Sequence, residues 1–144
     1  VARLLTSKAR SYTLQDLGFS EEALERITNA YKQSYGMILS TGPTGSGKTT
    51  TMYSILKLVN TRERNLTSIE DPIEYRLPGA NQVQVNPKTN LTFAAGLRSL
   101  LRQDPDVIFV GEIRDNETAS IAVNAALVSG WCEKFAPIVR KSNT

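Results

Sequence analysis

The residues best suited to chemistry lie in one run, Gly42-Pro43-Thr44-Gly45-Ser46-Gly47-Lys48-Thr49, which follows the phosphate-binding pattern G-x-x-x-x-G-K-[ST]. Glycines in such a loop let consecutive backbone N–H groups approach phosphate oxygens. Lys48 supplies positive charge for the β- and γ-phosphates, and the hydroxyl of Thr49 suits a Mg²⁺ ligand. We therefore predict that residues Gly42 to Thr50 bind ATP and that Thr49 binds Mg²⁺. The alternative is an ordinary glycine-rich turn with a chance lysine.

The segments on either side of this loop have the patterns of a strand and a helix. Residues 37–41 form a short apolar run that predicts a strand leading into the loop. After the loop, residues 50–60 carry apolar side chains at helical spacing. A strand, a glycine-rich loop and a helix in this order aim the helix N-terminus at an anion. This context favours phosphate binding over a simple turn.

A second candidate site is acidic and follows a predicted strand at 66–69. Its sequence is Glu70-Asp71-Pro72-Ile73-Glu74-Tyr75, with three carboxylates within five residues. Ligands of open α/β sheets bind at the carboxyl ends of the strands. We therefore predict that this run, beginning with Glu70, positions Mg²⁺ or a water molecule. The alternative is an acidic turn on the surface.

A third candidate follows the apolar run 107–110, which is typical of a central parallel strand. Gly111 and Glu112 come next, so the segment has the Walker B pattern of an apolar strand followed by an acid. A generic version has the acid directly after the strand, whereas here glycine takes that place and Glu112 follows. We predict that Glu112 polarises the attacking water or holds Mg²⁺ through a water molecule.

Further helices and one exposed strand complete the expected α/β architecture. The helices are predicted at 20–34 with Ser20 as N-cap, at 92–103 with Thr92 as N-cap, and at 117–128, and the strand is predicted at 82–85. Arg98 and Arg102 lie four residues apart on one helix face and are candidates for contact with phosphate or a neighbouring subunit. Exposed arginines are, however, common on helices.

Composition and charge narrow the class of protein. The 144 residues, 40% hydrophobic and 22% charged, fit one ordinary globular domain. No run approaches the roughly 18 apolar residues of a membrane span. The absence of histidine excludes a histidine-based zinc site or triad, and the single cysteine, Cys132, excludes an internal disulfide and fits a reducing cytoplasm. A net charge of +3 is too small to predict a nucleic-acid partner.

Three segments together resemble one family far more specifically than any of them alone. They are the loop 42–49, the run 69–75, and the run 101–115, which reads Leu-Arg-Gln-Asp-Pro-Asp-Val-Ile-Phe-Val-Gly-Glu-Ile-Arg-Asp. The sequence from 1 to about 130 resembles the ATPases of type II secretion and type IV pilus assembly.

The resemblance implies a RecA-like P-loop NTPase core working as a cytoplasmic hexamer at the inner membrane. Such a hexamer would use ATP hydrolysis to move an inner-membrane platform protein. It also implies that Glu112 is the Walker B glutamate and best candidate for general base, and that Glu70–Glu74 is the family's acidic box, with Glu70 catalytic. Arg3 lies in a stretch similar to the strand that joins the family's N-terminal domain to the ATPase core.

The resemblance ends at Trp131, where the family continues with a histidine-containing segment that is missing here. We therefore expect a truncated catalytic domain. Residues 1–18 would be a linker and the end of a strand from a missing N-terminal domain, 19–130 a partial RecA-like ATPase domain, and 131–144 a divergent, non-native tail. Truncation would leave an incomplete core and an incomplete active site, so we expect nucleotide binding with weak turnover.

Two other functions stay open at this point. One is a nucleotide-binding module that no longer hydrolyses ATP and acts through its partners. The other is a DNA-translocating motor on the same core, which the acidic second motif and the modest charge oppose. A small-molecule kinase is disfavoured because the sequence has no lid segment and no acceptor-binding signature.

Overall fold

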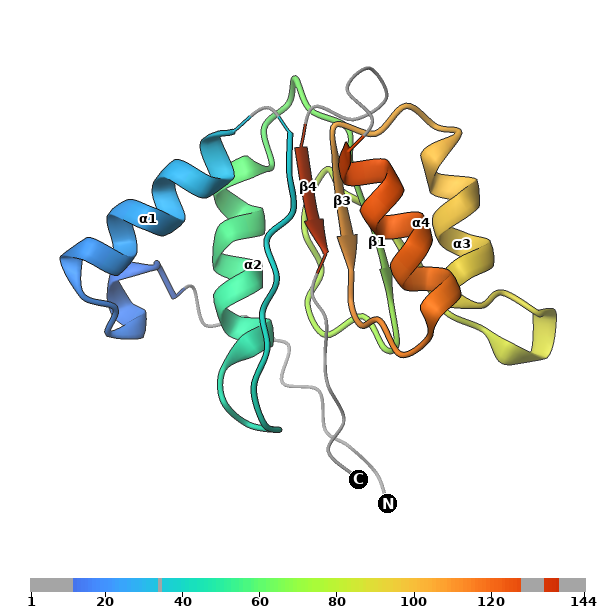
Figure 1. Cartoon of the computed structure of the whole chain (residues 1–144), viewed down its shortest axis with the longest axis horizontal. Coiled ribbons are helices and arrows are strands. Elements are labelled where there is room, and N and C mark those ends of the chain that lie inside the picture. Colours follow the sequence, from blue (N-terminus) through green and yellow to red (C-terminus); the bar gives the residue numbers. More distant parts are fainter. Residues whose placement is uncertain (1–11, 34, 128–133, 138–144) are drawn as a thin grey trace.

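The core of the protein is a sheet of four parallel strands covered by helices on both faces (Figure 1). This computed structural model describes residues 12–33 and 35–127 together with the backbone of 134–137. The strands are β1 (Leu66–Glu70), β2 (Asn81–Gln84), β3 (Val107–Val110) and β4 (Lys134–Pro137), in the spatial order β2-β1-β3-β4. The predicted α/β class with a parallel sheet is confirmed.

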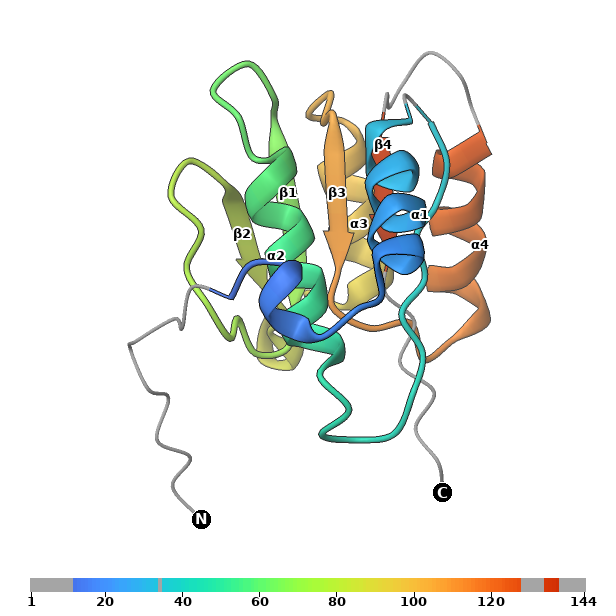
Figure 2. The ribbon, with the colours of Figure 1, turned by 90° about the vertical axis from the view of Figure 1, so that its left-hand side faces the viewer.

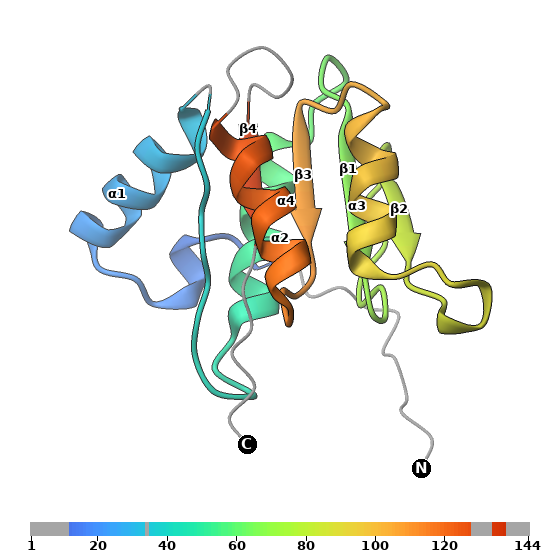
Figure 3. The same cartoon turned by 45° about the vertical axis from the view of Figure 1, so that its right-hand side comes forward.

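The four α-helices follow the predicted order and nearly the predicted bounds. They are α1 (Glu21–Lys32), α2 (Lys48–Val59), α3 (Phe93–Leu101) and α4 (Asn116–Leu127), with short 3₁₀ helices at Gln15–Leu17 and Pro87–Thr89. Ser20 and Thr92 cap α1 and α3 as predicted, since each side-chain oxygen accepts a hydrogen bond from the backbone N–H three residues later. Figures 2 and 3 show α2 covering one face of the sheet and α3 and α4 the other.

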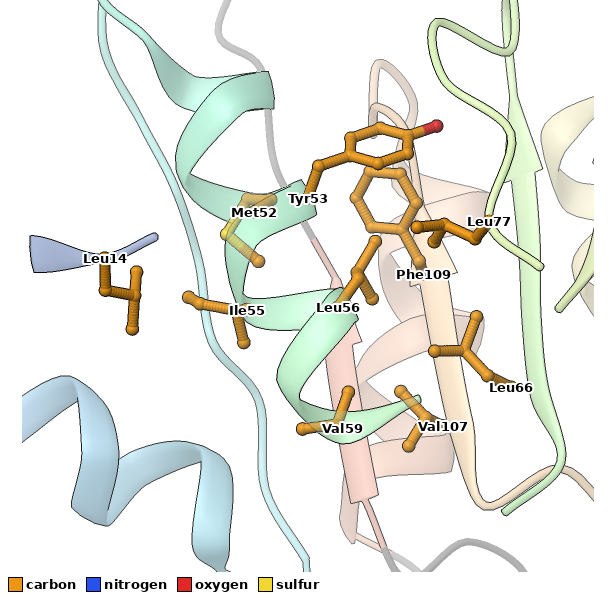
Figure 4. Packing of buried hydrophobic residues seen from close by; sticks show 10 residues of the cluster. All are labelled: Leu14, Met52, Tyr53, Ile55, Leu56, Val59, Leu66, Leu77, Val107 and Phe109. Atoms are coloured by element: carbon orange, nitrogen blue, oxygen red, sulfur yellow. The ribbon is translucent and has the colours of Figure 1, made fainter. Parts of the chain in front are cut away.

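Strand β1 separates two hydrophobic clusters because alternate side chains of a strand point to opposite faces. Leu66 faces the cluster formed with α2, and Ile69 faces the cluster formed with α3 and α4. Figure 4 shows the first cluster, in which five side chains of α2 pack against residues of β1 and β3. This packing fixes α2, and with it the loop at its N-terminus, over the carboxyl ends of the strands.

The predicted strand at 37–41 is wrong, although the segment runs extended beside the sheet. Met37 packs against one hydrophobic cluster and Ile38 against the other, which is the alternation expected of a strand. However, β3 already pairs with β1 on one edge and with β4 on the other, so neither of its edges is left for 37–41. An apolar cavity of about 230 Å³ lies beside the segment, lined by Ile38 and by residues of α1, α2 and β3.

Several predictions concern residues outside the described ranges. They include the strand end at 1–5, Arg3, Cys132 and most of the tail 131–144, of which the structure describes only the backbone of β4. The boundary at residue 18 stays a prediction, although Leu14 is buried in the core before it. None of the described helices is long and apolar enough to cross a membrane.

Candidate nucleotide-binding site

The glycine-rich loop ends where α2 begins, as the sequence pattern predicts. Gly47 is the residue before the helix and has a φ of 85°, a left-handed conformation that glycine adopts without steric cost. The first intrahelical bond of α2 runs from the Thr51 N–H to the Gly47 carbonyl. The N–H groups of Lys48, Thr49 and Thr50 precede this bond and have no acceptor within the helix, so they are available to an anion.

The side chain of Lys48 hydrogen-bonds to the backbone at the start of the glycine-rich loop. Its Nζ donates to the carbonyl oxygens of Gly42 at 2.6 Å and Pro43 at 2.5 Å, and it lies 3.5 Å from Oγ of Ser46. The ammonium is therefore held inside the curve of the loop, at the N-terminus of α2. A positive side chain and the positive end of a helix dipole there act together on a negatively charged ligand.

Gly111 brings the carboxyl ends of β1 and β3 close together. Its N–H donates to the Ile69 carbonyl at 2.8 Å, and a Cβ on Gly111 would lie 3.2 Å from the Cα of Glu70. A larger residue would therefore press directly on backbone. This close approach explains why glycine takes the position at which a generic Walker B pattern has its acid, and why the acid comes one residue later.

Glu112 is 5% exposed, and its two carboxylate oxygens have different surroundings. Oε2 lies 3.0 Å from Nε of Arg114, a side chain that is itself largely exposed. Oε1 is buried and has no hydrogen-bond partner among the described residues. Buried polar atoms without a partner are rare, so this oxygen marks a place where a ligand, an ion or a water molecule can bind.

Glu70 is 3% exposed and its carboxylate is held by three side chains. Oε2 accepts from the hydroxyl of Tyr53, while Oε1 accepts from Ser68 Oγ at 2.6 Å and from Gln82 Nε2 at 3.2 Å. Burial raises the pKa of Glu70 above its ordinary value of 4.5, and the three hydrogen bonds oppose this rise. Burial also raises the pKa of Tyr53, so its hydroxyl keeps its proton and remains a donor.

One polar cavity of about 390 Å³ brings the three predicted sites together. This volume falls within the ordinary range for small-molecule sites, about 300–1,000 Å³. Of the predicted site residues, the ones that line the cavity are Thr44, Gly45, Gly47, Lys48, Thr49, Thr50, Glu70 and Glu112. Gly42, Pro43 and Ser46 do not line it, and their oxygens contact the ammonium of Lys48.

The residues around the cavity fit a Mg²⁺ ion bound together with phosphate. Mg²⁺ usually takes one or two protein ligands and completes its shell with water and phosphate oxygens. Thr49 and Glu112 line the same cavity, and Oε1 of Glu112 is a buried oxygen without a hydrogen-bond partner among the described residues. Within the described residues, no group of three or more Asp, Glu, Cys or His side chains could hold a metal.

Sequence reasoning missed the side chains that hold the two acids, namely Tyr53, Ser68, Gln82 and Arg114. These contacts depend on the register of the sheet, which the sequence does not show. Ser68 pairs with Gln82 across β1 and β2. Because alternate side chains of a strand share a face, Ser68 and Gln82 lie on the face that carries Glu70. The predicted ligand candidates Arg98 and Arg102 contact Glu117 and Ser99 instead, so neither of these contacts is with the loop.

A parallel sheet flanked by helices, with a glycine-rich loop leading into a helix beside two strand-end acids, defines a RecA-like P-loop NTPase core. The chain belongs to the Type II/IV secretion system protein family, whose sequence profile matches residues 1–131. The resemblance seen in the sequence is thereby confirmed.

Relatives of the chain include secretion and pilus proteins. The chain is 55% identical to type II secretion system protein E of Pseudomonas aeruginosa and 54% identical to the type IV pilus assembly ATPase PilB of Thermus thermophilus. Each alignment spans 127 residues and 88% of this chain, but only 25% and 14% of the two relatives. The chain therefore spans a quarter or less of these two relatives.

Two solved structures have the same fold and detectable sequence identity. The pilus retraction motor PilT, solved with bound ADP, superposes with a TM-score of 0.77 at 37% identity, covering 96% of this chain and 39% of that one. The VirB11 ATPase of the Brucella suis type IV secretion system, solved with sulphate, gives 0.62 at 29% identity, covering 94% and 40%.

Proposed function

We propose that this chain is the nucleotide-binding part of an ATP-hydrolysing motor that powers type II secretion or type IV pilus assembly. The observation that carries the proposal is the single cavity in which Lys48, Thr49 and Glu112 converge. The names of the relatives, a type II secretion protein and a pilus assembly ATPase, support the choice of machine.

Each part of the site has a role in this proposal. The backbone N–H groups at the start of α2 and the ammonium of Lys48 bind the phosphates of ATP. Thr49 and Glu112 hold Mg²⁺, which when bound neutralises charge that develops on the phosphates. Glu112 also accepts a proton from the attacking water, directly or through one water molecule. Glu70, the second proposed catalytic carboxylate, lines the same cavity as the loop.

The whole motor extends beyond this chain in the proposal. We infer a hexamer on the cytoplasmic side of the inner membrane that acts on a platform protein of the secretion or pilus machine. The domain boundaries at 19 and 130 are part of the same proposal. In the chain alone we expect ATP binding with weak turnover, because groups outside residues 19–130 would contribute to transition-state charge stabilisation.

Hydrolysis by a Glu112→Gln variant tests the proposal, with Glu117→Gln as the matched control. Glu117 is an exposed acid on α4 whose bond to Arg98 lies outside the cavity. We expect Glu112→Gln to lower turnover about 10²-fold or more, with a smaller loss of Mg·ATP affinity, and Glu117→Gln to change neither. A wild-type chain that binds Mg·ATP without any turnover would favour a nucleotide-binding module, and DNA-stimulated hydrolysis would favour a DNA-translocating motor.

A further inference from the structure

We propose that Gln82 is a positioning residue that holds the Glu70 carboxylate and the segment 71–77 in fixed places at the cavity. This inference rests on the proposed function, because it concerns a carboxylate that we assign to ATP hydrolysis. Gln82 lies on β2, at the edge of the sheet, and does not itself line the cavity.

The amide of Gln82 joins three parts of the chain. Its Nε2 donates to the Tyr75 carbonyl at 2.9 Å and to Oε1 of Glu70 at 3.2 Å, with a longer contact of 3.4 Å to the Tyr53 hydroxyl. Its Oε1 accepts from the Leu77 N–H at 2.8 Å. Only one orientation of the amide satisfies these partners, since a flipped amide would face a carbonyl with its oxygen and an N–H with its NH₂.

The same amide connects the acid to the segment that follows it. Residues Asp71, Pro72 and Glu74 line the cavity, and their segment crosses back over the α2 face to reach β2. Gln82 bonds the far end of this segment, at Tyr75 and Leu77, while it also bonds Glu70 at the near end. Both ends of the connection are therefore hydrogen-bonded to one side chain of β2.

The other donors to Glu70 come from different elements, which restricts the carboxylate further. Tyr53 donates to it from α2, about one helical turn after Thr49, and Ser68 donates to it from β1. In Figure 4 the Tyr53 hydroxyl points away from the hydrocarbon side chains that surround the ring. Gln82 is the member of this set that also hydrogen-bonds the backbone of the segment, at Tyr75 and Leu77. Tyr53 contacts the segment edge-to-face, with its ring centroid 5.0 Å from that of Tyr75.

The test is a carbon-13 NMR titration of the Glu70 carboxyl group in wild type, Gln82→Met and Gln84→Met, with Glu70→Gln to assign the resonance. Methionine keeps the length of glutamine but removes the hydrogen bonds. Gln84 is the matched control for the bond to Glu70, because it is two residues along the same strand and its 3.4 Å bond from the Ile73 N–H reaches the segment without reaching the carboxylate. Tyr53→Phe provides a second variant that removes one donor with little change in volume.

We expect Gln82→Met and Tyr53→Phe each to raise the titration midpoint of Glu70 by about one pH unit, since each removes a donor to the charged form. Gln84→Met should leave it unchanged. An unchanged midpoint in Gln82→Met, or an equal rise in Gln84→Met, would overturn the proposal.

Single-turnover hydrolysis of Mg·ATP adds a readout for catalysis. Here we expect Gln82→Met to slow turnover about tenfold while the Kd for Mg·ATP changes less than about twofold. A loss of affinity with unchanged turnover would assign Gln82 a structural role only and overturn its role in positioning. The NMR titration needs no nucleotide, so it tests the role of Gln82 even if the chain fails to bind ATP. Failure to bind ATP would refute the proposed function.

Discussion

Replacement of Leu56 by alanine tests whether α2 packs tightly on the sheet. Leu56 is 0% exposed, and it lies in the cluster of α2, β1 and β3 side chains shown in Figure 4. The change removes three buried carbon atoms at about 0.8 kcal/mol each. The cavity left behind adds about 24 cal/mol per Å³ that the surroundings do not refill. We therefore expect the free energy of unfolding to fall by about 3 to 4 kcal/mol.

The assay is urea unfolding followed by circular dichroism, with Leu58→Ala as the matched control. Leu58 is on the same helix but is 51% exposed, so its replacement should change stability by less than about 0.5 kcal/mol. The predicted loss is a large fraction of the roughly 5–15 kcal/mol typical of a domain. A loss below about 1 kcal/mol for Leu56→Ala, or equal losses for both variants, would refute the packing of α2 described here.

Three further predictions concern the ends of the strands and the start of α4. Gly111→Ala should cost about 1–3 kcal/mol and weaken Mg·ATP binding, because the new Cβ would lie 3.2 Å from backbone of Glu70, and calorimetry would detect both effects. Asp115→Ala should cost about 1 kcal/mol at neutral pH, since Asp115 caps α4 through the Thr118 N–H, and unfolding curves at several pH values would measure it. The pKa of Asp115 is lowered from 3.8, so this cost should shrink as pH falls below 3.8, and a cost independent of pH would contradict it. The pKa of Glu70 is raised from 4.5, so the folded state favours its protonated form, and the stability of wild type relative to Glu70→Gln should fall as pH rises above 4.5. A constant difference in urea midpoints across that range would refute the assignment.

The order of the helices and most strands could be predicted because local patterns decide them. The caps at Ser20 and Thr92 and the apolar run 107–110 are signals that act within a few residues. The prediction of a strand at 37–41 was wrong because strand pairing depends on which edge of a neighbouring strand is free. The edge of β3 is occupied by β4 instead. Strand β4 itself was not predicted, since four residues that end in proline carry no periodicity.

The site could be predicted as a set of motifs but not as a set of contacts. The loop pattern and the position of Glu112 after a strand were enough to predict that both lie at one edge of the sheet, and both line one cavity. The surroundings of Glu70 could not be predicted, because its donors come from three separate elements. Both carboxylate oxygens of Glu70 accept hydrogen bonds from protein side chains. The acidic run had instead suggested a carboxylate free to bind Mg²⁺.

Binding of a nucleotide with Mg²⁺ by the loop 42–49 can be measured by calorimetric titration of ATP with and without Mg²⁺. Wild type should be compared with Lys48→Ala and with Lys57→Ala, which removes the same charge from the other end of α2. We predict Mg²⁺-dependent binding that weakens at least about tenfold in Lys48→Ala and stays unchanged in Lys57→Ala. Absence of binding in a folded wild-type chain, or equal losses in both variants, would contradict it.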